Sequence, residues 1–405
     1  MPKDNPALDK PHTTEPDHAS ALRRALLAWY RKHHRKMPWR PPPGAGNAKY
    51  VDPYYSLVSE AMLQQTQVAT VIPYFERFVG ELPTVQALAD ADEQRVLRLW
   101  QGLGYYRRAR NLHAAAKMIV NDFAGDVPAD VASLLKLPGV GRYTAGAIAS
   151  IAHGTPAPIV DGNVARVFAR LFLIDDPIDR PDVVKQLWSL AESLVPKSSP
   201  GDFNQALMEL GALVCTPKSP GCLTCPLRSQ CAAVEQGDPE RVPIKLPKKK
   251  PQEVTHVVVA VRRDGKYLFE QRPATGLWSN MWQLPTWEDA PAGSVKHITR
   301  NRRVTTRGQA RTTATSTRPL RGDAAVSIAP VCDWFADRFG ITPGPFTPVQ
   351  DFTHQTTHRT IRFIVLTADA KQGRTRPNTG RWLKLDQLDD LPLPNPQRTA
   401  IQHLA

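Results

Sequence analysis

Long apolar runs are missing from this sequence of 405 residues. Its most apolar stretches, such as Val257–Val261, fall far short of the ~20 residues that cross a bilayer. Residues 1–20 are polar and acidic and lack the apolar core of a signal peptide. Cysteine is also scarce, with five residues, and a chain of this length without an export signal is not expected to use disulfides. These absences predict a protein that is not associated with a membrane. We expect it in the cytoplasm, and at the nucleoid if its source is bacterial.

Acidic side chains are outnumbered by basic ones. Lys and Arg total 52 against 38 Asp and Glu, which leaves a formal net charge of +14 at pH 7. This excess favours a polyanionic partner such as nucleic acid, with a solvated basic surface as the alternative. Hydrophobic residues make up 41% of the chain, enough to form a core, which excludes a wholly disordered protein. The length predicts two or three domains.

The first domain is expected to be all-α and to cover residues 21–234. Apolar side chains recur three and four positions apart there, for example in Ala21–His33, and Pro and Gly separate the segments into many short helices. Residues 1–20 contain four prolines and few large apolar side chains, which predicts a disordered tail. Residues 235–253 contain four prolines and three consecutive lysines, which predicts an exposed linker.

A second, α+β domain is expected over residues 254–400. The apolar runs Val254–Val261 and Lys266–Glu270 flank the turn residues Arg263-Asp264-Gly265 and predict a hairpin, whereas Val331–Phe339 predicts a helix. Residues 289–323 contain eight Lys and Arg against two Asp and show no periodicity. We interpret them as a disordered basic insertion, which either contacts DNA phosphates or has no function.

Four of the five cysteines, Cys215, Cys222, Cys225 and Cys231, fall within 17 positions. Four thiolates can close a tetrahedral zinc site or hold a [4Fe–4S] cluster. Zinc sites favour two close pairs of cysteines, and only one pair is close here. The asymmetric spacing resembles the cluster loop of the endonuclease III family of DNA glycosylases, which implies [4Fe–4S] and leaves zinc as the alternative. Cys332 is expected to be an ordinary buried thiol.

The segment Leu137-Pro-Gly-Val-Gly141 is expected to form a tight turn between two helices. Gly139 and Gly141 allow the backbone to turn so that amides at the start of the next helix can grip a phosphate. A Gly- and Pro-rich stretch then ends at Asp161. Asp before Gly is most often a turn or an N-cap. This combination, however, resembles the helix-hairpin-helix signature of the same glycosylase superfamily, which implies that Asp161 is catalytic.

Residues 58–68 resemble a motif of the MutY-type adenine DNA glycosylases within this superfamily. The resemblance implies that Glu60 is the acid catalyst, although a glutamate in a helix is usually only a solvated charge. Bifunctional relatives carry a lysine nucleophile where this chain has Tyr143, and a phenol cannot form the imine required for strand cleavage. Little lyase activity is therefore expected, and Tyr143 and Asn163 are expected to orient the two carboxyls.

The same resemblance implies a set of DNA contacts. Gly102-Leu-Gly-Tyr-Tyr106 matches a family segment that places aromatic rings beside arginines, as a wedge for a base stack requires. Gln65 and Tyr105 are the candidates to fill the gap that a displaced base leaves. Thr66 and Leu103, within the same two segments, are expected to contact DNA as well.

The C-terminal part resembles the Nudix-like domain that recognises 8-oxoguanine in this family, beginning with residues 276–285. The metal-binding glutamates of a Nudix hydrolase are missing, so a reader and not a pyrophosphatase is expected. The family's Phe-Ser-His loop is here Thr356-Thr357-His358, so that the hydroxyl and the imidazole remain while the aromatic ring is lost. Thr357 and His358 are therefore expected to contact DNA.

The resemblance as a whole implies a monomeric adenine glycosylase of base excision repair. It is expected to combine an all-α helix-hairpin-helix domain containing an iron–sulfur loop with an α+β Nudix-like domain, and to hydrolyse the N-glycosidic bond of adenine opposite 8-oxoguanine or guanine in double-stranded DNA. The alternatives are thymine removal from G·T mismatches, a non-enzymatic iron–sulfur DNA-binding protein, and a Nudix hydrolase. The presence of Glu60, Asp161 and the C-terminal reader disfavours the first two, and the missing glutamates disfavour the third.

Overall fold

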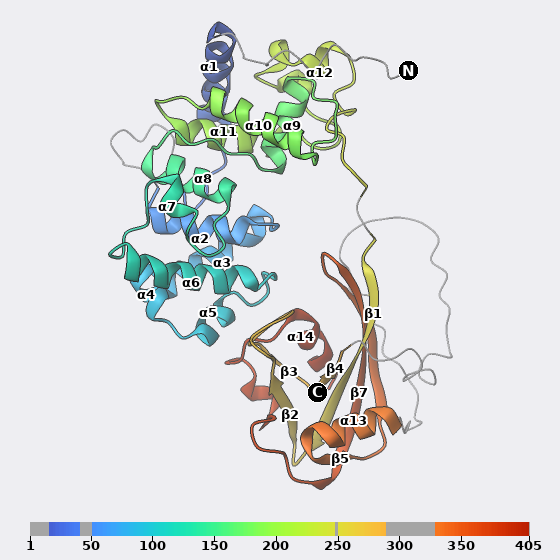
Figure 1. Ribbon diagram of the computed structural model, residues 1–405. Helices are drawn as coiled ribbons and strands as arrows, with labels where there is room; N and C mark the ends of the chain where they lie inside the picture. The colour runs from blue at the N-terminus through green and yellow to red at the C-terminus, as the bar shows by residue number, and fades with distance from the viewer. Residues whose placement is uncertain (1–15, 41–50, 248–249, 289–328, 405) are drawn as a thin grey trace. The chain divides into compact units, whose positions relative to one another are not determined.

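The computed structural model describes residues 16–40, 51–247, 250–288 and 329–404 (Figure 1). The predicted insertion at 289–323 lies outside these ranges. Contacts divide the chain into two units, Met1–Ala91 with Arg108–Pro247 and Asp92–Arg107 with Lys248–Ala405. The first is helical and the second contains every described strand, so the predicted all-α and α+β fold classes are confirmed. None of the helices in the described part of the chain has the length and hydropathy to span a bilayer.

The helical unit is built from short helices, and two 3₁₀ turns lie in its cysteine loop. In chain order its helices are α1 (Pro16–His33), α2 (Pro53–Leu63), α3 (Val68–Glu81), α4 (Val85–Asp90), α6 (Arg107–Asp122), α7 (Val131–Leu134), α8 (Arg142–His153), α9 (Gly162–Leu171), α10 (Pro181–Leu194), α11 (Pro200–Leu213), η1 (Cys222–Thr224), η2 (Arg228–Gln230) and α12 (Ala232–Glu235).

Local signals determine where several of these helices begin and end. Asp52 caps α2 by accepting a hydrogen bond from the Tyr54 amide, and Pro53 follows at the first helical position. Helix α8 ends at His153 and is followed by Gly154, which has the left-handed conformation that favours glycine at this place. The apolar faces of α1, α9, α10 and α11 then share one core, centred on side chains such as Phe168 and Phe203 that solvent does not reach.

Two predicted boundaries differ from the structure. Helix α1 begins at Pro16, so residues 16–20 belong to the fold and not to the tail, because Ala19 is buried in the helical core. The predicted linker 235–253 is only partly a linker. Val242 is fully buried and Ile244 accepts a hydrogen bond from the Ile178 amide, and the first strand already begins at Gln252.

The second unit contains a mixed sheet. Its strands are β1 (Gln252–Arg263), β2 (Lys266–Gln271), β3 (Trp282–Gln283), β4 (Thr286–Trp287), β5 (Ile341–Pro343), β6 (Thr347–Gln355), β7 (Arg359–Gly373) and β8 (Arg381–Leu383), with helices α5 (Glu93–Leu99), α13 (Ala329–Phe339), α14 (Asn395–Ile401) and the turn η3 (Leu385–Gln387). The sheet order is β3-β2-β1-β7-β5, with β4 on β1, β6 on β7 and β8 on β2.

Strand β1 lies at the centre of this sheet and is apolar on both faces. It runs parallel to β7 from Gln252 opposite Arg359 to Arg262 opposite Asp369. Val257, Val259 and Val261 pack with α13 in one core, whereas Val258 and Ala260 face a second core that includes residues of α14. A continuous apolar run is what a strand covered on both faces requires, which explains why the sequence here does not alternate.

Candidate active site

The four residues predicted to be catalytic line one cavity of about 490 Å³ in the helical unit. Glu60 comes from α2, Tyr143 from α8, and Asp161 and Asn163 from the beginning of α9. The fold therefore brings together residues that are far apart in the sequence. Their roles remain predictions, but the two carboxyls share a cavity, as the predicted chemistry requires.

Glu60 lies in an environment that favours its neutral form. The residue is only 7% exposed, and burial raises the pKa of its carboxyl to about 7. The hydrogen bond from Tyr143 opposes this rise, as does the charge of Arg40, whereas the nearby Asp161 carboxylate adds to it. Glu60 can therefore hold a proton near neutral pH, where an ordinary glutamate is ionised.

Asp161 is fixed by the helix that it caps. One carboxylate oxygen accepts a hydrogen bond from the Val164 amide at 2.7 Å, and the other accepts one from Asn163 Nδ2 at 3.1 Å. Burial raises the pKa of Asp161, but these hydrogen bonds act in the opposite direction because they stabilise the charged carboxylate. The carboxylate is thus held in one orientation within the cavity.

Tyr143 remains protonated, and its hydroxyl contacts Glu60 and Met208. Burial raises the pKa of its phenol well above the ordinary value, and the charges of Glu60 and Asp161 raise it further. Its hydroxyl lies 3.1 Å from Sδ of Met208 and also forms a hydrogen bond with Glu60. The cavity therefore contains a phenol where bifunctional relatives are expected to have an amine.

Arg166 connects this site to the cysteine loop. Its Nη2 donates to Asn163 Oδ1 at 2.9 Å, and its Nε donates to the Cys215 carbonyl at 2.7 Å. The same Nη2 also donates to the Gly211 carbonyl, where α9 and α11 are so close that a Cβ on Gly211 would meet Asn163 Cβ at 2.7 Å. Asp161, Asn163, Arg166 and the loop therefore form one chain of hydrogen bonds.

We expect Arg166→Gln to slow base excision by about tenfold or more, since a glutamine cannot reach Asn163 and Cys215 together. The matched control is Arg170→Gln, one turn further along α9. Arg170 donates to the carbonyls of Thr216, Pro217 and Val242, but it does not contact Asn163. Single-turnover rates of the predicted base excision and the content of bound metal should be measured for both. Equal rate losses in the two variants would contradict a specific role of Arg166 in positioning Asn163.

A guanidinium–carboxylate group in the same cavity was not predicted from the sequence. Glu209 accepts hydrogen bonds from Arg35 Nε at 2.8 Å and Nη2 at 3.0 Å, and Arg40 Nη1 lies 3.5 Å from the same carboxylate. The Arg40 side chain is 8% exposed, and its Nε has no hydrogen-bond partner among the described residues. The cavity thus offers an unsatisfied donor beside a buried carboxylate. These arginines are about 170 residues from Glu209, so no local pattern signals the group.

The residues predicted to contact DNA after α2 form a constrained loop. Gln65 adopts the left-handed backbone conformation with a φ of 60°. Arg108 donates to the carbonyls of Met62 at 2.7 Å and Gln64 at 2.6 Å, and to Thr66 Oγ1 at 3.2 Å. Arg108 is therefore buried against the end of α2.

The predicted hairpin connects α7 and α8. Gly139 has a φ of +80°, and a Cβ there would meet Asn111 Cβ at 2.6 Å, so the position requires glycine. Gly141 is the N-cap of α8 and has no side chain to cap it, which leaves the first amides of the helix available to an anion.

Two predicted DNA contacts from different parts of the sequence meet in the second unit. Tyr105 is 47% exposed, and its hydroxyl lies 3.5 Å from Oγ1 of Thr357 in the turn between β6 and β7. Thr357 and His358 are exposed, and the Thr356 hydroxyl closes the turn by bonding the Arg359 backbone. Leu103, in contrast, is 6% exposed, so the DNA contact predicted for it is not supported.

The four clustered cysteines lie in one loop beside α9. Arg170 Nη1 lies 3.3 Å from Cys215 Sγ, and the Cys231 thiol lies 3.5 Å from the Arg170 carbonyl. Burial, together with the charges of the other three thiols, raises the pKa of Cys225 to about 11, so all four cysteines lie close enough to interact electrostatically. Within the described ranges, no group of three His, Cys, Asp or Glu side chains has the arrangement of a single-ion site.

Comparison with known proteins gives the same division of the chain. Residues 58–193 match the HhH-GPD superfamily of base excision DNA repair proteins, and residues 256–403 match a NUDIX domain. The adenine DNA glycosylase of Buchnera aphidicola from Schizaphis graminum is 30% identical over 381 residues, which is 93% of this chain and 96% of that protein. The chain belongs to the adenine DNA glycosylase family. The resemblance inferred from the motifs is thereby confirmed.

For some relatives, the match with this chain covers less than two thirds of their own length. The human adenine DNA glycosylase is 41% identical over 319 residues, and the match covers 66% of this chain and 58% of the human protein. A solved structure described as a thermostable thymine-DNA glycosylase matches 54% of this chain and 97% of its own, with 30% identity and a TM-score of 0.48.

Proposed function

We propose that this protein is a monofunctional adenine DNA glycosylase of base excision repair, which removes adenine opposite 8-oxoguanine or guanine. The observation that carries the proposal is the cavity in which a carboxyl with a pKa of about 7, Glu60, lies beside a second carboxylate, Asp161, fixed by hydrogen bonds. Membership of the adenine DNA glycosylase family supports the choice of base.

In this mechanism Glu60 acts first as an acid. Adenine is a poor leaving group as an anion, and a proton delivered to its ring lowers the barrier to cleavage of the glycosidic bond. The sugar then carries positive charge, which the fixed carboxylate of Asp161 stabilises or traps covalently, as in retaining glycosidases. Glu60, now ionised, activates the attacking water. Two neighbouring carboxyls with opposite protonation states are a recurring arrangement in such reactions.

The arginine–glutamate group suits recognition of the expelled base. Arg40 presents an unpartnered Nε, which can donate to an acceptor nitrogen of adenine. Glu209 already accepts hydrogen bonds from Arg35 and Arg40 on both of its oxygens, so it positions the two guanidinium groups. A buried donor without a partner carries a desolvation cost that a bound base would remove. The base must leave the duplex to reach this group, which costs a few kcal/mol.

DNA would be held through several elements. The amides at the start of α8 suit a phosphate, and in the second unit the exposed Tyr105, Thr357 and His358 suit contacts to DNA bases. Gln65 is the candidate to fill the gap that the flipped nucleotide leaves, because it is exposed on the loop that Arg108 holds against the end of α2.

Cys215, Cys222, Cys225 and Cys231 would hold a [4Fe–4S] cluster. The thiols lie in one loop and are near enough to one another to raise the pKa of Cys225. Their asymmetric spacing in the sequence, which resembles the family's cluster loop, favours the cluster over zinc. The cluster would stabilise the loop that Arg166 and Arg170 contact.

The rate of adenine release in a single turnover should fall as the pH rises above about 7, because Glu60 loses its proton in that range. The limiting slope should be about tenfold per pH unit. The rate should also fall toward low pH as Asp161 becomes protonated, and the raised pKa of Asp161 moves this limb toward neutrality. Quenched-flow rates from about pH 5 to about pH 9 test this. A rate that stays constant through neutrality would contradict the role of Glu60.

One assay tests the proposed function directly. The purified protein is incubated with duplexes that carry A opposite 8-oxoguanine, A opposite guanine, or T opposite guanine, and free base is compared with strand breaks. We expect adenine release from the first two without strand breaks. Thymine release would instead assign the mismatch specificity considered above, and binding without release would indicate a non-enzymatic DNA-binding protein.

A further inference from the structure

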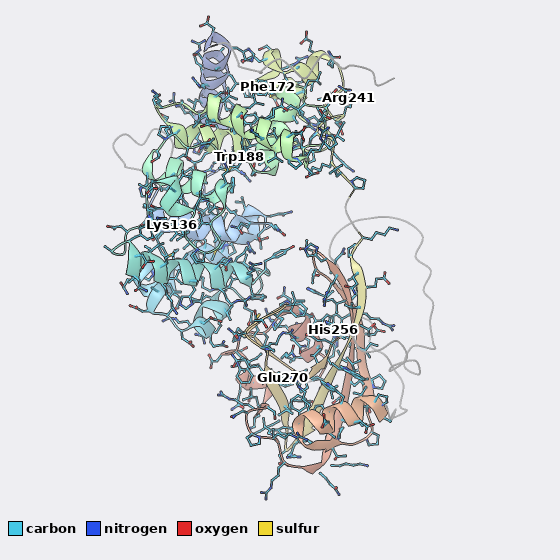
Figure 2. The ribbon with its side chains drawn as sticks, in the orientation of Figure 1. Lys136, Phe172, Trp188, Arg241, His256 and Glu270 are labelled. Atoms are coloured by element: carbon cyan, nitrogen blue, oxygen red, sulfur yellow. The ribbon has the colours of Figure 1, made fainter. Side chains whose placement is uncertain are left out.

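The hydroxyl of Tyr143 has two hydrogen-bond partners, and the mechanism proposed above assigns no role to one of them. Besides its hydrogen bond with Glu60, the hydroxyl donates to Sδ of Met208 at 3.1 Å. Met208 lies on α11 and packs against the core of the helical unit, as does Phe172, which follows α9 and is labelled in Figure 2. Met208 also lines the cavity that contains Glu60 and Asp161. Its thioether therefore lies among the predicted catalytic groups.

The phenol has one proton to share between these two partners. A thioether can only accept a hydrogen bond, so the proton that is directed at Met208 is not available to Glu60. While Glu60 is protonated, its own O–H can donate to the phenol oxygen, and the phenol proton points at the sulfur. When Glu60 is ionised, its carboxylate is the stronger acceptor, and the phenol proton turns to it. The two protonation states of Glu60 thus correspond to two directions of one O–H bond.

The phenol does not ionise in the range in which Glu60 titrates. Burial, together with the charges of Glu60 and Asp161, holds the pKa of Tyr143 well above its ordinary value. The ring of Tyr143 packs against the helical core, which keeps it in place. Rotation of the hydroxyl proton is therefore the way in which this residue responds to a change at Glu60.

The charged groups around Glu60 have partners of their own. The Asp161 carboxylate accepts hydrogen bonds from two groups at the start of its helix, and the Glu209 carboxylate of α11 accepts them from Arg35 and Arg40. Arg40 lowers the pKa of Glu60 and Asp161 raises it, both through their charges. These groups influence how readily Glu60 ionises, whereas the sulfur influences where the phenol proton points.

We propose that Met208 is a positioning residue for the acid step, because its thioether holds the Tyr143 hydroxyl proton away from Glu60 until Glu60 has protonated the base. This inference rests on the proposed function. In the step, the O–H bond of Glu60 breaks and an N–H bond forms on the adenine ring. The phenol proton then turns from the sulfur to the new carboxylate. The hydrogen bond that stabilises this anion forms only as the proton leaves, which favours the transition state over the resting enzyme.

Met208→Leu is expected to move the alkaline limb of the pH–rate profile to lower pH by about half a unit or more. Leucine has a similar volume but accepts no hydrogen bond, so the phenol proton is directed to Glu60 and stabilises its ionised form. Single-turnover adenine release should fall by about threefold at about pH 8 and change little at about pH 6. A limb that does not move would overturn the proposal.

Met62→Leu is the matched control for this exchange. Met62 is fully buried on α2, two positions after Glu60, but it does not line the cavity. The alkaline limb should stay in place in this variant. Met208→Gln brings an amide oxygen to the phenol and should restore the limb that leucine moves. An equal shift in Met62→Leu, or a glutamine variant that behaves like leucine, would show that packing and not an acceptor sets the profile.

The pH dependence of unfolding supplies a readout that requires no excision. Because folding raises the pKa of Glu60 to about 7, the free energy of unfolding falls as the pH rises through this value. Met208→Leu lowers this pKa, so the fall between about pH 4 and about pH 8 should be smaller. If this difference appears in a protein that releases no adenine, the proposed function fails and the hydrogen-bond arrangement stands. If adenine is released and neither readout changes, the role of Met208 alone is refuted.

Discussion

The Glu60→Gln variant is expected to lose adenine excision by at least about 10³-fold while it still binds the mismatched duplex. Glutamine has nearly the same shape but no proton to deliver to the base and no carboxylate to activate water. Single-turnover release and equilibrium binding should be measured on the same duplex. Excision that survives would remove Glu60 from the mechanism, and lost binding would indicate that the substitution had damaged the fold or the DNA contacts.

The same variant should be more stable than the unaltered protein at alkaline pH. The pKa of Glu60 rises from 4.5 to about 7 on folding, so the native state binds the proton more tightly than the unfolded state. The stability of the unaltered protein therefore falls as the pH rises from about 4.5 through about 7, by up to about 3 kcal/mol. Glutamine does not ionise, so the variant does not lose this stability as the pH rises. Denaturant unfolding should show this gain at about pH 8 and none at about pH 4.

The Asp161→Asn variant is expected to lose excision by about 10³-fold or more with little change in stability. Asparagine can still accept the hydrogen bond of the Val164 amide, and it is as good an N-cap as aspartate. The substitution removes the negative charge that faces the developing sugar cation, together with the oxygen that accepts the longer hydrogen bond from Asn163 Nδ2. Single-turnover release should therefore fall, whereas the unfolding midpoint should change little.

Asp161→Ala serves as the control for the capping role. It removes the cap and should cost about 1 kcal/mol of stability in addition to the loss of excision. If Asp161→Asn retained excision while Asp161→Ala lost it, the function of Asp161 would be structural, and the proposed chemistry would need another anion.

Much of this architecture follows from the sequence because the signals are local. Helical periodicity and Pro and Gly punctuation predict the α-helical unit, and the continuous apolar run of Val257–Val261 predicts a buried strand. Strand β6 (Thr347–Gln355) was not predicted, because it is polar, contains a proline and gains its structure by pairing with β7. The candidate catalytic residues could be predicted because short motifs surround them in the sequence.

The parts of the site that were missed depend on tertiary contacts. Arg40 and Glu209 meet only after folding, and neither belongs to a recognisable string. Arg166 lies three positions after Asn163 on the same helix, a spacing that could have suggested contact. Its contact with the Cys215 carbonyl depends on how the cysteine loop packs, which the periodicity of the sequence does not predict.

The close packing of α9 and α11 at Gly211 has a consequence for inherited variation. Gly211 carries no functional group, yet the first atom of any side chain there would push against Asn163 and thus against the partner of Asp161. A mutation as mild as alanine would therefore impair the reaction through crowding alone. Gly211 is therefore important to this enzyme because it has no side chain.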